Sequence, residues 1–336
     1  MMSVCILDQS GEVLVHRTMQ TDPDTFLKAI APYRQGVVVA VECLCTWYWL
    51  ADLCADAGLP FVRGHALSMQ AIHGGKAKND PSDSHKIAAL LRGGMRPQAY
   101  VYPAKMRATR DVLRRRMPLA HKRAALLAHV QNTHSQSNLP AMGKKIAYKA
   151  NREGVAERCA DAAVQKRIAV DLALITSDDA LRRDVELPIV QTAKHHDAHT
   201  RYLLHTVPGI GTMLRLVLLY AIPDVTRVPR VQEFVSSCRL VQCARESAGT
   251  RYGTSGATLG HAHRKWAFAE AAVLFLRDHP AAQKYLARVE KKHDTGHVVT
   301  ILAQTLARAV SDRLKRHGAF NTEKCFQRYT IREGSG

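Results

Sequence analysis

Two acids three residues apart, Asp80 and Asp83, stand just before an apolar helical stretch in residues 75–92. Positions i and i+3 of an α-helix lie on one face, so the first turn of such a helix can direct both carboxylates toward one point. Two hard oxygen ligands there could hold Mg²⁺ with some of its waters kept. The same pattern arises when Asp80 caps the helix and Asp83 complements its N-terminal dipole. The two residues alone leave both interpretations open.

A third acid, Glu42, ends the apolar run of residues 36–42, which predicts a strand buried on both faces. Open α/β sheets place their ligands at the carboxyl ends of such strands. Three carboxylates gathered at one sheet edge would repel one another unless a divalent cation neutralised them, so this arrangement would argue for metal. The alternative for Glu42 is an ion pair with one of the many arginines.

A candidate nucleophile, Ser247, lies in the polar, glycine-rich stretch of residues 245–260. Serine is a weak nucleophile until a base or a metal activates it, and most serines in such stretches cap a helix or make a turn. Arg251 and Lys265 lie nearby in the sequence, with His261 or His263, and could neutralise a phosphate.

The elements that must position these residues divide the chain into an α/β part and a helical part. Up to Pro103 the order β-β-α-β-α-β-α predicts a mixed sheet with helices on its faces, and the ranges are 3–7, 12–19, 23–33, 36–42, 46–57, 59–62 and 65–73. Long helices at 104–138 and about 161–199, the second with a kink or break at Pro188, predict a helical hairpin or coiled-coil arm used for self-association.

The charge of the chain points to a polyanionic partner. Lys and Arg number 48 against 29 acids, which gives a net charge of +19 and a pI near 9.8. Residues 101–160 hold 13 Lys or Arg and 3 acids. A solvated helix face is the alternative to phosphate contact. The basic candidates for nucleic-acid binding are Lys76, Lys78, Arg114, Arg115, Arg116, Lys122, Arg123, Lys144, Lys145, Arg251 and Lys265.

Backbone groups offer a further phosphate contact at Val207-Pro208-Gly209-Ile210-Gly211, between two helical stretches. Gly209 and Gly211 permit a tight turn whose N–H groups face outward before a helix N-terminus, as in a helix-hairpin-helix motif. Any tight turn between packed helices is the alternative.

Several protein classes are excluded by what the sequence does not contain. No apolar run approaches the ~20 residues of a spanning helix, and no signal peptide begins the chain. The 8 cysteines form no CxxC pair, which disfavours structural zinc and indicates reduced thiols in a cytoplasmic protein.

Taken in order, Glu42, the segment KAKNDPSDSHKIA, the basic arm, TVPGIG, RLVQCARESAGTRYGTSG and GHAHRKWAFAEAA resemble one family over essentially the whole chain. The resemblance is to DEDD-type insertion-sequence transposases related to the Piv DNA invertase, whose recombination is guided by a bridge RNA. It implies an RNase H-like (RuvC-like) domain at residues 1–103, a basic helical or coiled-coil arm at 104–199 and a helical transposase domain at 200–330.

The resemblance also implies roles for the candidate residues. Glu42, Asp80 and Asp83 would be the second, third and fourth acids of a Mg²⁺ site, and Ser247 would attack a DNA phosphate and form a transient phosphoserine link. The implied partners are donor and target DNA, a guide RNA and further copies of the chain in a dimer or tetramer, in the bacterial cytoplasm at the nucleoid.

One departure from the family pattern concerns the first acid. The family carries it in a Gly-x-Asp motif on a strand ahead of the one that here begins at Ser3, and Asp8 is no substitute because it lies at the following hairpin turn. A chain made as written is therefore expected to have a weakened N-terminal fold and severely reduced activity. Two other functions stay open: a RuvC-like nuclease that uses metal-activated water, and a catalytically dead nucleic-acid-binding remnant.

Overall fold

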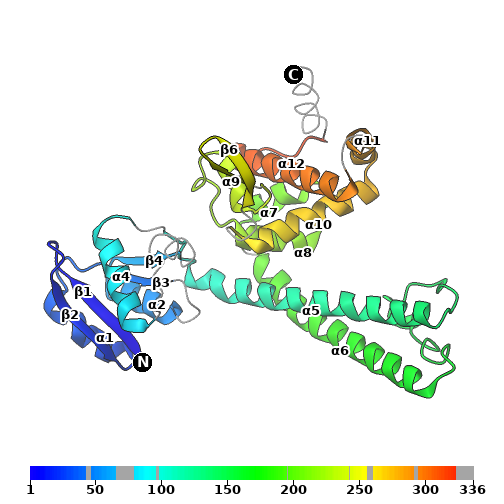
Figure 1. Cartoon of the computed structure of the whole chain (residues 1–336), viewed down its shortest axis with the longest axis horizontal. Coiled ribbons are helices and arrows are strands. Elements are labelled where there is room, and N and C mark those ends of the chain that lie inside the picture. The colour runs from blue at the N-terminus through cyan, green and yellow to red at the C-terminus, as the bar shows by residue number, and fades with distance from the viewer. Residues whose placement is uncertain are drawn as a thin grey trace. The chain divides into compact units, whose positions relative to one another are not determined.

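The computed structural model describes residues 1–42, 47–65, 79–95, 98–194, 196–241, 243–255, 260–290 and 294–322. The chain forms two compact units, Met1–Ala104 and Lys105–Gly336. It is a helix-rich mixed α/β protein in which the short strands of the first unit precede long helices of the second (Figure 1).

The N-terminal unit begins with the predicted hairpin. Strand β1 (Met2–Leu7) pairs antiparallel with β2 (Val13–Met19), which confirms the first two strands. Asp8 organises the turn, since its carboxylate accepts hydrogen bonds from the backbone N–H groups of Gly11 and Glu12 at 2.7 and 2.8 Å. Gly11 has a φ of 97°, a left-handed conformation that favours glycine.

A second pair of strands, β3 (Val39–Glu42) and β4 (Phe61–Gly64), is parallel. The predicted single mixed sheet is wrong for the described residues, because β1–β2 and β3–β4 are two separate two-stranded sheets. A cavity of about 550 Å³ lies between β1 and β3. Consecutive residues of both strands line it, in ranges 2–9 and 36–41, so the cavity follows the strand edges rather than one face.

Three helices complete the described part of this unit: α1 (Pro23–Ile30), extended by the 3₁₀ turn η1 (Ala31–Tyr33), α2 (Tyr48–Asp56) and α4 (Asp80–Arg92). The core joins Phe26, Ile30, Val39, Leu50, Cys54 and Leu59. Helix α4 packs on both β1 and β3. The helix predicted at residues 65–73 lies almost wholly outside the described residues.

The second unit begins with two long helices, α5 (Ala104–Gln136) and α6 (Ala162–Ala193), which confirm the predicted helical hairpin (Figure 1). Their antiparallel register is marked by ion pairs. Arg116 Nε lies 2.6 Å from Glu186, Arg123 Nε 2.5 Å from Asp179, and His129 Nδ1 2.5 Å from Asp171. From one ion pair to the next, the position on α5 advances by six or seven residues while the position on α6 moves back by seven or eight. Pro118 and Pro188 both lie inside their helices, so Pro188 does not break α6.

The connection between α5 and α6 has a small core of its own. Val130, Ile146, Val155, Ala156, Cys159 and Ile168 are buried there around the 3₁₀ turn η2 (Lys149–Asn151). Helix α6 ends at Ala193, earlier than the predicted residue 199, because a new helix, α7, begins at Ala198 behind the Asp197 cap.

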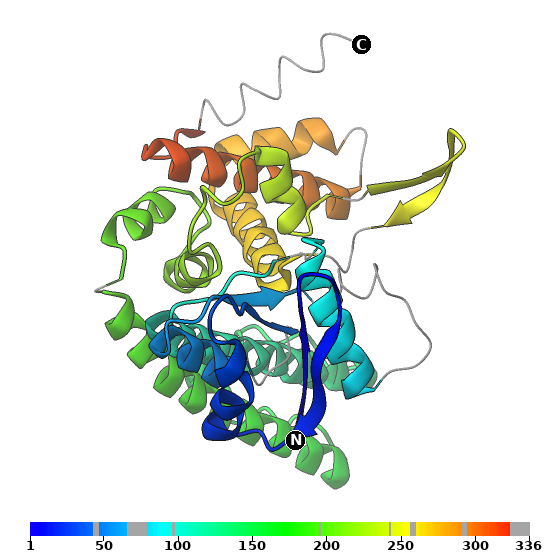
Figure 2. The same cartoon turned by 90° about the vertical axis from the view of Figure 1, so that its left-hand side faces the viewer.

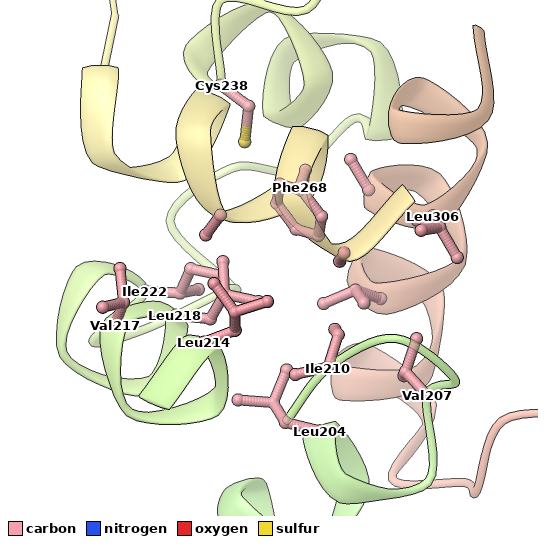
Figure 3. Packing of buried hydrophobic residues seen from close by; sticks show 14 of the residues in the cluster. Leu204, Val207, Ile210, Leu214, Val217, Leu218, Ile222, Cys238, Phe268 and Leu306 are labelled. Carbon is pink, nitrogen blue, oxygen red and sulfur yellow. The ribbon is translucent and has the colours of Figure 1, made fainter. Parts of the chain in front are cut away.

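The remaining helices surround the main hydrophobic core. They are α7 (Ala198–His205), α8 (Thr212–Ala221), α9 (Val231–Ser237), α10 (Ala262–Asp278), α11 (Pro280–Val289) and α12 (Thr295–Arg316). Figure 3 shows Leu204, Leu214 and Leu218 of α7 and α8 facing Phe268 of α10 and Leu306 of α12. Strands β5 (Cys243–Ser247) and β6 (Thr250–Ser255) form a hairpin that projects from the helices of this unit (Figure 2).

Candidate active site and nucleic-acid interface

The two aspartates lie where the sequence predicts them, in the first turn of α4. The helix is capped by Asn79, whose side chain accepts a hydrogen bond from the backbone N–H of Ser82 at 2.8 Å. The capping alternative for Asp80 is therefore wrong. His16 of β2 reaches the same turn, with its Nε2 atom 3.0 Å from the carbonyl oxygen of Pro81. This contact ties the acid-bearing turn to the first sheet.

The three acids differ in their surroundings. Asp80 is exposed, and Asp83 is half-buried with its Oδ1 atom 3.5 Å from Lys86 Nζ. Glu42 is half-buried at the last position of β3, opposite Gly64 of β4. Carboxylate oxygens are suitable ligands for Mg²⁺. Within the described ranges, however, no group of three or more His, Cys, Asp or Glu side chains is placed to hold a metal ion. The structure brings the aspartates onto one turn and does not gather Glu42 with them.

Ser247 occupies the last position of β5, at the tip of the β5–β6 hairpin. It pairs with Thr250 across a two-residue turn, Ala248-Gly249, whose φ angles are 49° and 74°. Positive φ at both central positions is typical of the type I′ turn that matches the twist of a hairpin. The polar, glycine-rich composition of residues 245–260 predicts a loop, so the hairpin is a correction. The sequence feature that could have indicated this hairpin is Gly249, because type I′ turns favour glycine.

The hairpin presents the serine to solvent together with charged neighbours. Ser247, Glu246 and Arg251 are all exposed, and Glu246 pairs with Arg251 across the two strands. Lys265 is exposed on α10. An exposed hydroxyl on a projecting hairpin can approach the phosphate of an extended polymer without a preformed cleft.

The basic candidates fall into two classes. Arg116 and Arg123 are held by Glu186 and Asp179 of α6, so their charges are neutralised within the arm. Five others are exposed and suited to phosphate contact: Arg114, Arg115, Lys122, Lys144 and Lys145. Lys76 and Lys78 lie outside the described residues.

The predicted phosphate-binding turn between α7 and α8 has a packing role at its first glycine. Gly209 has a φ of 80°, and a Cβ atom there would lie 2.2 Å from the carbonyl oxygen of Ala271 in α10. Gly211 has open space around its Cα atom, is exposed, and precedes α8 directly. Of the two glycines, Gly211 is therefore the one whose surroundings suit a ligand.

One basic residue of α5, Arg110, is absent from the predicted set. Arg110 lies one helical turn before Arg114 on α5 and lines a narrow cavity with it and with His261 and His263 of α10. The i, i+4 spacing of Arg110 and Arg114 on a predicted long helix could have indicated that both lie on one face.

Two family models match the chain. A DEDD transposase model of the IS110 group, described as "Transposase", matches residues 1–136. A second model, described as "Transposase IS116/IS110/IS902 family", matches residues 201–287. The chain carries IS110-family transposase domains. No curated protein matches the chain significantly.

Both matched models describe transposases, which supports an enzyme that acts on DNA as an insertion-sequence transposase. The first match spans β1 to α5 with all three acids, and the second spans α7 to α11 with Ser247. The three acids and Ser247 therefore each lie in a region that one of the family models matches. No helix of the described residues is long and apolar enough to cross a membrane.

Proposed function

We propose that this insertion-sequence transposase cuts and rejoins DNA through Ser247, guided by RNA and assembled as a homo-oligomer. The observation that carries the proposal is the exposed position of Ser247 directly before the two-residue turn of the hairpin, within the second matched region. A nucleophile there is held by its pairing with Thr250 and stays accessible to a strand of nucleic acid.

The proposed step transfers a phosphoryl group without net hydrolysis. The Ser247 oxygen attacks the phosphorus of a DNA phosphodiester, the bond to the leaving DNA oxygen breaks, and the serine proton passes to solvent or that oxygen. The product is a phosphoserine diester and a free DNA hydroxyl. Attack of another DNA hydroxyl on the diester reverses the chemistry and regenerates serine, so the energy of the phosphodiester is retained.

Glu42, Asp80 and Asp83 are the proposed Mg²⁺ ligands, on the basis of their oxygen chemistry and the first matched region. A bound Mg²⁺ would supply charge stabilisation at the attacking and leaving oxygens. Asp80 and Asp83 lie on one helix turn, and the Nζ atom of Lys86 lies 3.5 Å from Asp83 Oδ1.

A covalent trapping experiment tests the serine. Ser247→Ala should abolish both strand cleavage and the denaturant-resistant protein–DNA adduct, while duplex affinity stays unchanged. Thr250→Ala is the matched control, because it removes an exposed hydroxyl from the opposite side of the same turn. A metal-dependent nuclease would keep cutting after Ser247→Ala, and a catalytically dead remnant would bind DNA without ever breaking it. Either result would refute the proposal.

A further inference from the structure

A small cavity of about 20 Å³ lies among α5, α8 and the start of α10 in the second unit. Such a volume admits one oxygen-sized group. Its floor is apolar, formed by Leu113, Met117 and Val217. Its polar members are Arg110 and Arg114 of α5 and His261 and His263 of α10, with Tyr220 beside them.

The geometry of His261 fixes which ring nitrogen carries the proton. Its Nδ1 atom caps α10 by accepting a hydrogen bond from the backbone N–H of Arg264 at 3.3 Å. In the neutral ring the proton is therefore on Nε2, which is a donor. This Nε2 atom is fully buried and has no hydrogen-bond partner in the described structure. A buried donor without an acceptor is costly, and an incoming oxygen would satisfy it.

The charged side chains that lower the pKa of His261 are all basic. Burial, then Arg264, His263, Arg110 and Arg114, lowers the pKa of His261 to about 2. Burial, then Arg114, Arg110 and Arg239, lowers the pKa of His263 to about 4. Both rings are therefore neutral at pH 7. The cationic groups create a positive potential, which an apolar floor strengthens.

Two of these arginines are committed to the scaffold. The guanidinium of Arg264 donates to the Ala221 carbonyl and to Ser237 Oγ, and Arg239 Nε donates to the Gly260 carbonyl at 2.8 Å. Arg114 is exposed and lines the cavity, so it can also contact a large ligand.

We infer that this cavity is a subsite for one backbone phosphate of a nucleic acid. One phosphate oxygen enters the cavity and accepts the Nε2–H of His261, and Arg114 and Arg110 balance the negative charge. The subsite deepens the proposed function, on which it rests for the identity of the polymer. Its chemistry, a neutral N–H donor beside two guanidinium groups, distinguishes it from a general basic surface.

Inorganic phosphate is the first probe, titrated into the full chain while the histidine ring signals are followed by NMR. Bound phosphate should raise the pKa of His263, because the anion offsets the repulsion from the arginines, and should shift the Nε2–H signal of His261. His261→Asn should remove the response and keep the fold, since asparagine also caps helices. Phosphate that leaves both rings unchanged in the wild-type chain would overturn the inference.

A duplex of about 20 base pairs is the second probe, with affinity measured against salt. Arg114→Gln should lower the slope of log K against log salt by ~0.9, the value for one phosphate contact. Arg183→Gln, an exposed arginine on α6, is the matched control and should leave the slope unchanged. If both substitutions changed the slope equally, Arg114 would contribute only as general surface charge, and its role in the subsite would be refuted. A phosphate response without DNA cleavage would refute the proposed function alone, and cleavage without that response would refute the subsite alone.

Discussion

At the scale of single residues, the structure separates side chains that hold the fold from those that can act. Gly209 and Gly211 come from one motif and one prediction, yet only Gly209 packs against the backbone of α10. Arg114, Arg115 and Arg116 are consecutive, yet only Arg116 is buried and bound to Glu186. Residue type indicates what each side chain could do chemically. Which neighbour a side chain meets across the fold depends on tertiary packing that the sequence alone does not reveal.

Alanine substitutions at the two glycines of the α7–α8 turn are expected to change stability by very different amounts. Gly209→Ala should lower the free energy of unfolding by about 3 kcal/mol or more, since the new Cβ would overlap Ala271 and the residue needs a left-handed φ. Gly211→Ala should change it by less than about 1 kcal/mol, because the space around it is open and its φ is −70°. Urea unfolding followed by circular dichroism measures both. Similar losses in the two variants would contradict this assignment.

At the scale of elements, helices and the first hairpin follow closely from sequence patterns. The aspartate-rich entry at Pro23 predicts α1, and the long run nearly free of glycine predicts α5. The Ser247 hairpin and the separation of β1–β2 from β3–β4 do not follow, because short polar strands lack an apolar alternation and strand pairing is decided by distant partners. The position of Asp80 and Asp83 in the first turn of a helix was therefore predictable from the sequence. Whether Glu42 lies close to them was not.

The arm depends on Asp179, which accepts hydrogen bonds from Arg123 and Arg152, both at 2.5 Å. Partial burial raises the pKa of Asp179, but the two arginines outweigh it and the net pKa is lowered. A lowered folded-state pKa stabilises the fold above the ordinary value of 3.8, and this stability is lost as the pH falls through the folded-state value.

Asp179→Asn should therefore lower the free energy of unfolding at pH 7 by about 2 kcal/mol, because it leaves two guanidinium groups without a counter-charge. The difference from the wild-type chain should shrink as the pH falls below 3.8. Thermal unfolding at several pH values measures this. Asp278→Asn, which breaks an exposed pair with Arg277, is the control and should have little effect. A difference independent of pH would exclude the ion-pair explanation.

At the scale of the whole molecule, the net charge is +19, but some of the basic side chains form ion pairs within the fold. Composition predicts a polyanionic partner, and the family matches agree with DNA. Composition overstates the number of contacts, however, because part of the basic run is neutralised by α6. The residues near the α5–α6 connection, Lys144 and Lys145, are exposed and keep their charge available.

Lys144→Gln combined with Lys145→Gln should lower the slope of log K against log salt on duplex DNA by ~1.8, at ~0.9 for each lost phosphate contact. Stability should not change, since both side chains are exposed. Lys284→Gln on α11, also exposed, is the control for a general loss of charge. An unchanged slope in the double variant would show that the end of the arm does not touch DNA.

The gap between β1 and β3 gives the N-terminal unit an internal degree of freedom. No backbone ladder joins the two sheets in the described residues, so their separation is set by side-chain packing alone. Helix α4 contacts β1 and β3, and it carries Asp80 and Asp83, whereas Glu42 belongs to the second sheet. A rigid-body displacement of one sheet relative to the other would therefore change the distance between the aspartates and Glu42. The distance between the two aspartates and Glu42 in the proposed acid site thus depends on the separation of the two sheets.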